Sequence, residues 1–354
     1  MSTERSLRLQ QLRTLASSWR EPENASRVNA VSIYREGEDP FSEEVVAFAI
    51  NQRMTRLLDE EALTWSSRLP ENTPPQTIAL VRCSPVPLAG FWALTGALLS
   101  GHELHIYDVA GEVSLMSSFF RELPAELPLS WHGLEDLNEA GSAIDRAIVV
   151  GEPSDSSTIV GNVTELGVSE NATVSVNTGV SIGVVGGSPV QDEWEGLAED
   201  MLLYDGFGAG SVRLLFAPSE MPPDELAEAC ALFRGVYPVR ESTPGRLSMQ
   251  QAMLDAFDTP HVYGEGLEFL ISKGDPEIQQ RGHIRWVPYN HASEITHWID
   301  RTELALSQII ATDGIRDDVE RIRDVLPPGE AHRPPAGGRL PERFFTLISG
   351  MRRE

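Results

Sequence analysis

The sequence predicts an α/β protein with two domains, a doubly wound nucleotide-binding domain followed by a second α/β domain of catalytic type. Its 354 residues are enough for two hydrophobic cores. Apolar strand-like runs alternate with amphipathic segments of helical length, as in parallel βαβ units, and this alternation restarts after residue 172. We therefore expect a Rossmann-like domain over residues 1–172, a second domain over 173–326 and a Pro/Gly-rich C-terminal tail over 327–354.

Each element of the first half follows from its hydrophobic pattern. Apolar residues three to four positions apart predict one long amphipathic helix over residues 43–69. The runs that follow predict a strand at 77–83, a helix at 88–101, a strand at 103–109, a helix at 114–123 and a strand at 146–151. Short apolar strands that alternate with helices indicate a parallel sheet covered on both faces.

The second half repeats this pattern. Two apolar runs, broken at residues 177–179, open it. Helices are expected at 192–206, 223–237 and 247–257, strands at 211–218, 266–272 and 283–289, and a further helix that begins near 293 and includes residues up to 310. After its Pro/Gly-rich part the tail has four apolar residues, which predict that it docks on its own domain or on a neighbouring subunit: Phe344, Phe345, Leu347 and Ile348.

The charge balance is strongly acidic. The chain has 53 acidic residues against 28 basic ones, a net charge of −25, and Lys273 is its only lysine. Two explanations fit this composition: a salt-rich cytoplasm that screens the self-repulsion of the surface, or a high-GC genome with an acidic bias. Such a surface has no dense basic patch, which argues against duplex DNA and anionic membranes as partners.

Other features indicate a soluble, cytoplasmic protein without a metal site. The N-terminal residues mix arginine and glutamate without an apolar secretory core, and no window approaches the roughly 18 uninterrupted apolar residues of a membrane span. Cys83 and Cys230 are too few for a disulfide framework or a zinc site and are expected as buried thiols. His283, His291 and His297 lack the close pairing typical of metal ligands.

Four runs of the sequence resemble a known family. They are SPVPLAGFWALTGALLSGHELHIYD at 84–108, NTGVSIGVVGG at 177–187, LAEDMLLYDGFGAGSVRLLFAP at 197–218 and PPGEAHRPP at 327–335. In this order they are similar to the motifs of the LuxC family of fatty acyl-CoA reductases, a branch of the aldehyde dehydrogenase superfamily. The resemblance extends from about Arg82 to Pro341 and so covers most of the chain.

The resemblance implies a two-domain aldehyde dehydrogenase-like fold and a specific chemistry. Members of the family bind NADP(H) on the first domain, attack an acyl thioester with a cysteine of the second, and reduce the acyl-enzyme to an aldehyde. A thiolate is needed because it is both the nucleophile and a leaving group. An asparagine side chain and a backbone N–H supply the oxyanion donors. The cysteine's position, and with it Ala209 here, is expected at the cleft between the domains.

The sequence departs from the family at the positions where chemistry would occur. The family's cysteine falls on Ala209, and its oxyanion asparagine falls on Pro85, which has neither a side-chain donor nor an N–H. The lysine that holds the cofactor ribose falls near Tyr107. Gly151 ends a strand as a nucleotide-binding turn would, but the acidic stretch after it should repel phosphate. The resemblance therefore predicts a degenerate active site with no catalytic residue intact, in which Tyr107 and Gly151 remain as cofactor-binding candidates.

Several residues also have structural explanations. The glycines at 206, 208 and 210 can shape a tight helix-to-strand corner without any ligand. Ser211 is a weak candidate for a replacement nucleophile, because no histidine lies near it in the sequence to act as a base. His102 fits a contact with a helix-end carbonyl better than general-base catalysis.

Three functions remain open at this stage. The first is a non-catalytic LuxC-like subunit whose acyl or nucleotide pocket serves a partner, either an acyl-CoA or acyl-protein, or an acyl-activating enzyme or intact reductase. The second is an active NAD(P)H-dependent acyl-CoA reductase or aldehyde dehydrogenase with a relocated nucleophile. The third is an interaction protein that keeps only the fold. A homo-oligomer is expected, and NAD(P)H is the only cofactor considered.

Overall fold

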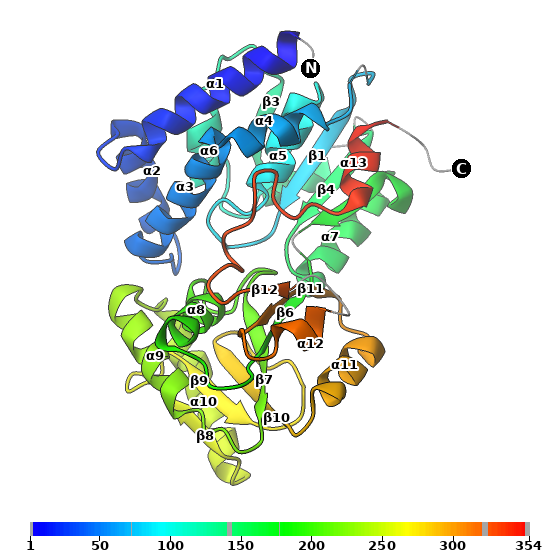
Figure 1. Ribbon diagram of the computed structural model, residues 1–354. Helices are drawn as coiled ribbons and strands as arrows, with labels where there is room; N and C mark the ends of the chain where they lie inside the picture. Colours follow the sequence, from blue (N-terminus) through cyan, green and yellow to red (C-terminus); the bar gives the residue numbers. More distant parts are fainter. Residues whose placement is uncertain (1–2, 72, 140–143, 177, 321–324, 351–354) are drawn as a thin grey trace. The chain divides into compact units, whose positions relative to one another are not determined.

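The computed structural model of the protein describes residues 3–71, 73–139, 144–176, 178–320 and 325–350 (Figure 1). Two compact units divide the chain: the first runs to Thr178 and resumes at Pro334, and the second is Gly179–Arg333. This division differs from the expected ranges in two respects. Residues 173–176 form a strand of the first sheet, and the tail is shared between the two units.

The first unit contains a five-stranded sheet in the order β3-β2-β1-β4-β5. All its neighbouring strands are parallel, as the alternation of strands and helices predicted. The strands are β1 (Thr77–Arg82), β2 (Glu103–Asp108), β3 (Leu129–Gly133), β4 (Arg146–Val150) and β5 (Thr173–Val176). The chain runs outward from β1 to β3 and then returns to place β4 on the other side of β1. This reversal is the switch point of a doubly wound domain, where such folds bind ligands.

Helices cover the first sheet. They are α1 (Thr3–Arg20), α2 (Ala25–Arg35), α3 (Glu43–Leu58), α4 (Glu60–Ser67), α5 (Phe91–Leu99), α6 (Leu115–Phe120), α7 (Pro153–Glu165) and α13 (Glu342–Ile348), with 3-10 turns at Leu134–Glu139 and Glu170–Ala172. Every residue of α5 is buried, which explains its run of small and apolar side chains. On one face of the sheet, Val81 and Val149 pack with Ile159 and Val163 of α7.

Arginines of α1 tie the helices of this unit together. The Arg5 side chain is buried, and it donates to the carbonyls of Leu99 at the end of α5 and Ser66 at the end of α4. Arg13 donates to the carbonyls of Leu57 and Leu58, where α3 ends. The last carbonyls of a helix have no partner within the helix, so these guanidinium groups cap three helix ends at once.

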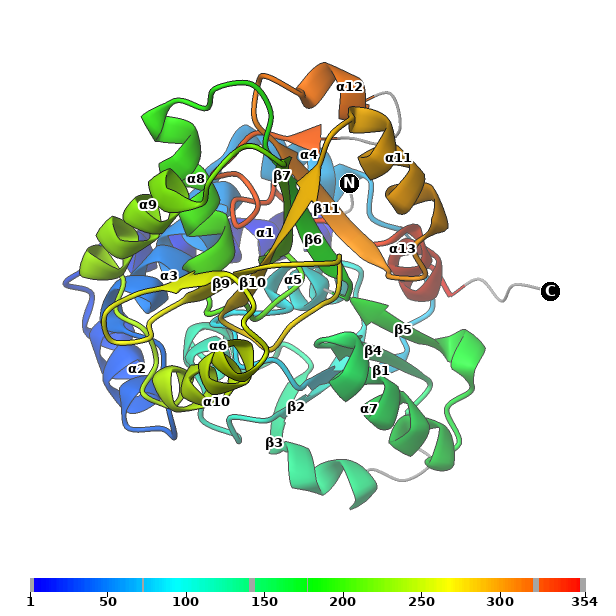
Figure 2. The ribbon, with the colours of Figure 1, turned by 90° about the horizontal axis from the view of Figure 1, so that it is seen from below.

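The second unit contains a seven-stranded sheet in the order β12-β11-β6-β7-β10-β9-β8, in which only the β8–β9 pair is antiparallel (Figure 2). Its strands are β6 (Val180–Val184), β7 (Val212–Pro218), β8 (His261–Tyr263), β9 (Leu270–Lys273), β10 (His283–Tyr289), β11 (Leu306–Ala311) and β12 (Val325–Leu326). Its helices are α8 (Gln191–Leu202), α9 (Asp224–Val236), α10 (Ser242–Ala256), α11 (Ala292–Arg301) and α12 (Arg316–Glu320).

Two element predictions were wrong, and some strands were missed. The expected long helix over 43–69 is broken at Asp59, whose ψ of 154° is extended. At this break Arg13 donates to the carbonyls of Leu57 and Leu58, the last two residues of α3. Strand β3 was not predicted at all. The helix expected from 293 up to 310 ends at Arg301, and the rest of that run forms β11.

The tail docks on its own unit, which is one of the two alternatives expected from the sequence. Phe344 of α13 is fully buried, and Arg146 donates to the carbonyl of Leu347 over 2.6 Å. His102 Nε2 lies 2.8 Å from the carbonyl oxygen of Ile348 at the end of α13, which confirms the helix-end contact expected for this histidine. Within the residues that the structure describes, no helix is both long and apolar enough to cross a membrane.

Candidate active site

The glycine-rich loop joins α8 to β7, as predicted. Two of its glycines are in the left-handed region, Gly206 with a φ of 78° and Gly208 with a φ of 81°. A Cβ added to Gly206 would lie 2.9 Å from the backbone nitrogen of Gly282. Both a left-handed backbone and a close backbone neighbour require glycine, so the geometry of the corner alone explains this residue.

Ala209 lies between these constraints and is 9% exposed. Its carbonyl accepts a hydrogen bond from Ser181 Oγ at 2.5 Å. The next residue, Gly210, packs against a neighbouring segment, because a Cβ there would lie 2.9 Å from the Ala331 carbonyl and 3.0 Å from His332 Nδ1. Ala209 thus sits in a well-packed corner and contributes only a methyl group.

Ser211 is fully buried. Its hydroxyl donates to the Phe207 carbonyl over 2.6 Å, and its N–H donates to the Gly208 carbonyl. A serine nucleophile needs a base that takes the proton of its hydroxyl. The Ser211 hydroxyl instead donates its proton to a carbonyl of the same loop, and this hydrogen bond stabilises the turn.

An arginine cluster surrounds the same loop. The guanidinium carbons of Arg240, Arg246 and Arg281 lie 4.9, 5.7 and 4.3 Å from the centre of the Phe207 ring. Positive groups over an aromatic face are attracted by its quadrupole. The adjacent Asp205 accepts a hydrogen bond from Arg234 at 2.7 Å. These contacts hold the corner in place from outside the loop.

Asp200 anchors a second segment to this corner. Its side chain is fully buried, and it accepts hydrogen bonds from the N–H groups of Gly329 and Ala331 at 2.7 and 3.0 Å. Burial raises the pKa of Asp200 to about 8, against the smaller lowering effect of the two N–H donors. Arg333 forms an ion pair with Glu199. The Leu-Ala-Glu-Asp run therefore has a structural role, because it fixes residues 329–333 beside the glycine corner.

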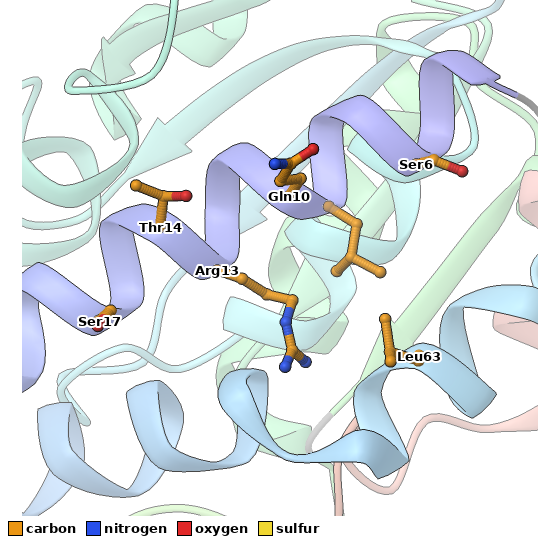
Figure 3. Close-up of a pocket in the computed structure, with 7 residues that line it drawn as sticks. Ser6, Gln10, Arg13, Thr14, Ser17 and Leu63 are labelled. Atoms are coloured by element: carbon orange, nitrogen blue, oxygen red, sulfur yellow. The ribbon is translucent and has the colours of Figure 1, made fainter.

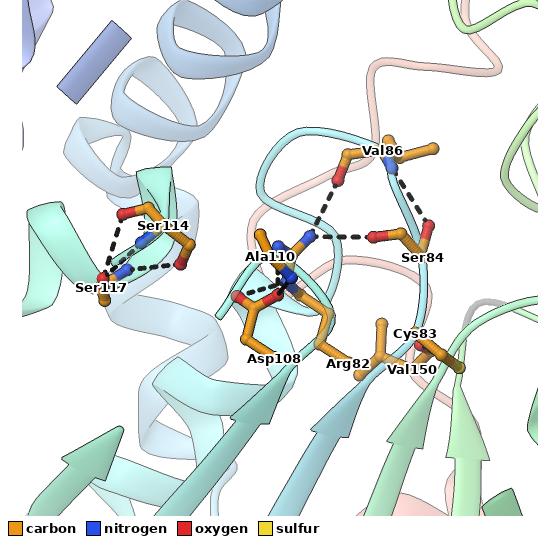
Figure 4. Close-up of polar contacts among 9 residues, drawn as sticks. All are labelled: Arg82, Cys83, Ser84, Val86, Asp108, Ala110, Ser114, Ser117 and Val150. Atoms are coloured by element: carbon orange, nitrogen blue, oxygen red, sulfur yellow. Dashed lines mark hydrogen bonds and ion pairs between the residues drawn. The ribbon is translucent and has the colours of Figure 1, made fainter. Parts of the chain in front are cut away.

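The carboxyl edge of the first sheet contains a buried ion pair (Figure 4). Arg82 at the end of β1 donates to both carboxylate oxygens of Asp108 at the end of β2, over 2.9 and 2.6 Å. Asp108 is fully buried and also accepts from the N–H of Ala110. A third nitrogen of Arg82 donates to the carbonyls of Ser84 and Val86. An acidic residue at this strand end normally binds the ribose in dinucleotide-binding domains, but here it is occupied by Arg82.

Pro85 lies in the loop that Arg82 holds. The backbone on each side of it is fixed, since the carbonyls of Ser84 and Val86 accept from the guanidinium. The Val86 N–H donates to Ser84 Oγ at 3.3 Å. These hydrogen bonds hold the loop at Pro85, which the sequence resemblance aligns with an oxyanion asparagine, and proline offers no donor.

Cys83 and Gly151 meet at the switch point between β1 and β4. A Cβ on Gly151 would lie 2.4 Å from Cys83 Sγ, and that thiol donates to the Val150 carbonyl. Gly151 is therefore explained by close packing against the sulfur. Helix α7 follows directly and begins at Pro153. Proline has no N–H to offer a phosphate at a helix N-terminus.

The other sequence candidates lie apart from any reactive arrangement. Tyr107 is 3% exposed, and its ring stacks on His132 with centroids 5.0 Å apart. Cys230 is fully buried on α9, and burial raises the pKa of its thiol to about 12. His283 is buried with Nε2 2.7 Å from Ser272 Oγ. Among the residues described, no group of three or more metal-ligating side chains comes together.

A groove of about 420 Å³ lies beside α1 (Figure 3). Its lining side chains include Ser6, Gln10, Thr14 and Arg13. The Arg13 guanidinium is engaged with the end of α3. The residues that line the groove include no carboxylate, histidine or cysteine, so its hydroxyl groups have no base among them to activate a nucleophile.

Comparison with known proteins identifies the fold. No protein-family model matches the chain, and no curated protein matches its sequence. An NAD-dependent benzaldehyde dehydrogenase from Corynebacterium glutamicum has a TM-score of 0.67 at 10% identity, over 91% of this chain and 81% of its own. A salicylaldehyde dehydrogenase from Pseudomonas putida G7 has a TM-score of 0.68 at 11% identity, over 92% and 78%. An oxidoreductase from Marinobacter aquaeolei has a TM-score of 0.68 at 12% identity, over 98% and 84%.

These similarities confirm the predicted aldehyde dehydrogenase-like fold. At sequence identities this low, they show the fold alone.

Three features were not anticipated from the sequence. They are the Arg82–Asp108 pair, the packing of Cys83 on Gly151, and the arginines around Phe207. The first had a visible signal, because both partners end adjacent apolar strands. The arginines come from segments far apart in the chain and had none.

Proposed function

We propose that this protein, which has an aldehyde dehydrogenase-like fold, is a LuxC-like homologue that forms no acyl-enzyme and acts by binding. The observation that supports this most directly is Ala209 at the glycine corner. The corner is intact, since its left-handed glycines and the Asp200 anchor are all present. Only the nucleophile is replaced, and a methyl group cannot form a thioester.

Neither cysteine compensates for this replacement. The thiol of Cys230 is fully buried with a pKa raised to about 12, so almost none of it is thiolate near neutral pH. Cys83 belongs to the first unit and donates its S–H to the Val150 carbonyl. A thiol used as a hydrogen-bond donor is the protonated form, which is a poor nucleophile.

A nicotinamide cofactor fits the carboxyl edge of the first sheet poorly. The acid that would bind a ribose is paired with Arg82, and the helix that would receive the pyrophosphate starts with proline. The benzaldehyde dehydrogenase of similar fold is NAD-dependent, so a dinucleotide remains the cofactor to test. We infer that any such binding is weak, and we derive no reaction step from it.

The proposed role is therefore that of a partner subunit. The ligand would be an acyl-CoA or an acyl-protein, and the partner an acyl-activating enzyme or an intact reductase. An exposed apolar stripe on α10 and its C-cap residue supports association between chains: Met249, Met253 and the C-cap Phe257 are spaced four residues apart and are 63%, 50% and 77% exposed. We place the expected homo-oligomer contact on this stripe, and Phe257→Glu should then lower the oligomeric mass measured by light scattering, whereas Leu232→Glu on α9 should not.

The catalytic part of the proposal is tested by turnover. The purified chain is incubated with acyl-CoA and NADPH, and separately NADH, at its working salt concentration, and aldehyde formation is followed. We expect no turnover. The second candidate function is an active reductase with a relocated nucleophile. Turnover that disappears in Cys83→Ser but persists in Cys230→Ser would support it, because Cys83 is the partly exposed thiol.

A further inference from the structure

A second pocket lies at the far end of β7 from the glycine corner. It has a volume of about 360 Å³ and is formed by the loop after β7, by β8 and by side chains of β9 and β10. All its residues belong to the second unit. Strand β7 has seven residues, which at about 3.3 Å each separate its ends by roughly 20 Å. The pocket is therefore distinct from the site around Ala209.

The floor of this pocket is apolar and buried. Ile271 and Trp286 line it and are 1% and 2% exposed. Both belong to the core that α8 and α9 form on this sheet, and Met221 and Val262 pack against the same core. A preformed apolar cavity of this size suits a small ligand with a hydrophobic body.

The rim has one strong polar feature. Lys273, the only lysine of the chain, lines the pocket at the end of β9. Its N–H donates to the Pro260 carbonyl, which fixes its backbone. In the part of the chain that the structure describes, no ion pair is recorded for its ammonium group.

The other charged or titratable groups of the rim are Glu220 and His261. His261 Nδ1 lies 2.9 Å from the Thr259 carbonyl, and its Nε2 lies 3.6 Å from the Asp255 carboxylate. The imidazole is therefore already engaged on both sides. Lys273 is therefore the group of the rim that can form an ion pair with an incoming anion. The Glu220 carboxylate would repel a ligand with more than one negative charge.

We propose that this pocket binds a small monocarboxylate with an apolar body, such as a short fatty acid or an aromatic acid. Its carboxylate pairs with the Lys273 ammonium, and its hydrocarbon part packs on Ile271 and Trp286. In parallel α/β sheets, ligands commonly bind outside the carboxyl ends of the strands. The pocket meets that rule, since it is formed where β7 and β9 end.

The single lysine makes occupancy measurable without any activity. An amine-reactive reagent can label only the Lys273 side chain and the N-terminal amine, and the two labels are separated by peptide mass spectrometry. Millimolar hexanoate should slow labelling of Lys273 and leave the N-terminal label unchanged. Hexanol, which has the same body without the charge, and inorganic phosphate, which has charge without the body, should not protect.

Variants separate the two parts of the pocket. Lys273→Gln should weaken hexanoate affinity, followed by tryptophan fluorescence and calorimetry, by at least about tenfold, because a charge-assisted hydrogen bond is lost. Lys273→Arg should retain most of it. Met221→Glu should abolish protection of Lys273 by placing a carboxylate in the pocket, and Arg301→Gln on α11 is the control for a lost surface charge. Equal protection by hexanol and hexanoate, or no protection by hexanoate in a folded wild-type chain, would overturn the proposal.

Discussion

Arg82 and Asp108 face each other at the ends of two adjacent parallel strands and are joined by two hydrogen bonds of 2.9 and 2.6 Å. Both side chains are buried, at 5% and 0% exposure. A buried pair of this kind contributes little net stability as a pair, but removal of one partner leaves an uncompensated buried charge. The pair therefore has consequences for both stability and cofactor binding.

The first consequence concerns stability. Arg82→Ala should lower the free energy of unfolding by about 3 to 5 kcal/mol, because Asp108 would remain buried without its partner. The double variant Arg82→Met with Asp108→Leu should recover a large part of this loss. Denaturant unfolding of the three proteins measures both effects. A double variant as unstable as Arg82→Ala would show that the buried charge is not the cause.

The second consequence concerns the cofactor. With Asp108 occupied by Arg82 and a helix that starts at Pro153, dinucleotide affinity should be weak. The acidic residues that follow Gly151 should disfavour the additional phosphate of NADPH most, so we expect NADPH to bind worse than NADH. Calorimetry with both cofactors at the working salt concentration decides this. Micromolar NADPH affinity would contradict the prediction.

The pH dependence of stability should depend on Asp200. Burial raises the pKa of Asp200 to about 8, so between pH 4 and 8, roughly, the folded protein holds a proton that the unfolded chain has released. The free energy of unfolding should therefore fall as pH rises through this range, by up to about 1.4 kcal/mol per pH unit from this group. Asp200→Asn cannot titrate and should reduce that slope. The free energy of unfolding is measured in urea at pH 6 and pH 8. The same change between the two pH values in the wild type and in Asp200→Asn would refute this role.

The glycine corner makes a backbone prediction. Gly206→Ala should cost at least about 1 kcal/mol, because alanine is strained at a φ of 78° and its Cβ would meet the Gly282 backbone. Gly245→Ala is the matched control: that glycine lies in α10 with no heavy atom within 4 Å of an added Cβ. Alanine should be neutral or stabilising there by up to about 1 kcal/mol. Thermal unfolding distinguishes the two sites, and equal effects would mean that the corner is not strained.

The sequence was sufficient for the parts of the fold that local patterns determine. The parallel first sheet followed from alternating strands and helices, and the corner between α8 and β7 followed from its glycines. Asp59 escaped prediction because the break there depends on Arg13, 46 positions away in the chain. Strand β3 is short and only partly buried, so its hydrophobic signal is weak.

The candidate site was predicted only where a residue's type was itself informative. Ala209 and Pro85 stood out because each lacks a chemical group that the family's motif requires. The pairing of Asp108 was missed although Arg82 and Asp108 end adjacent predicted strands, because it also depends on the register that places Arg82 opposite Asp108. The reason for a glycine at position 151 could likewise be seen only once the position of the Cys83 sulfur was known.

The central claim is that no residue of this chain forms a covalent bond with an acyl group. It is tested most directly by the intact mass of the wild-type protein after incubation with labelled acyl-CoA. We predict an unchanged mass for the wild-type chain and at most slow labelling of Ala209→Cys. The resemblance, which aligns Pro85 with the family's oxyanion asparagine, predicts faster labelling when Pro85→Asn is added, since one missing oxyanion donor costs about 3 to 4 kcal/mol. A stoichiometric acyl adduct on the wild-type chain would contradict the account.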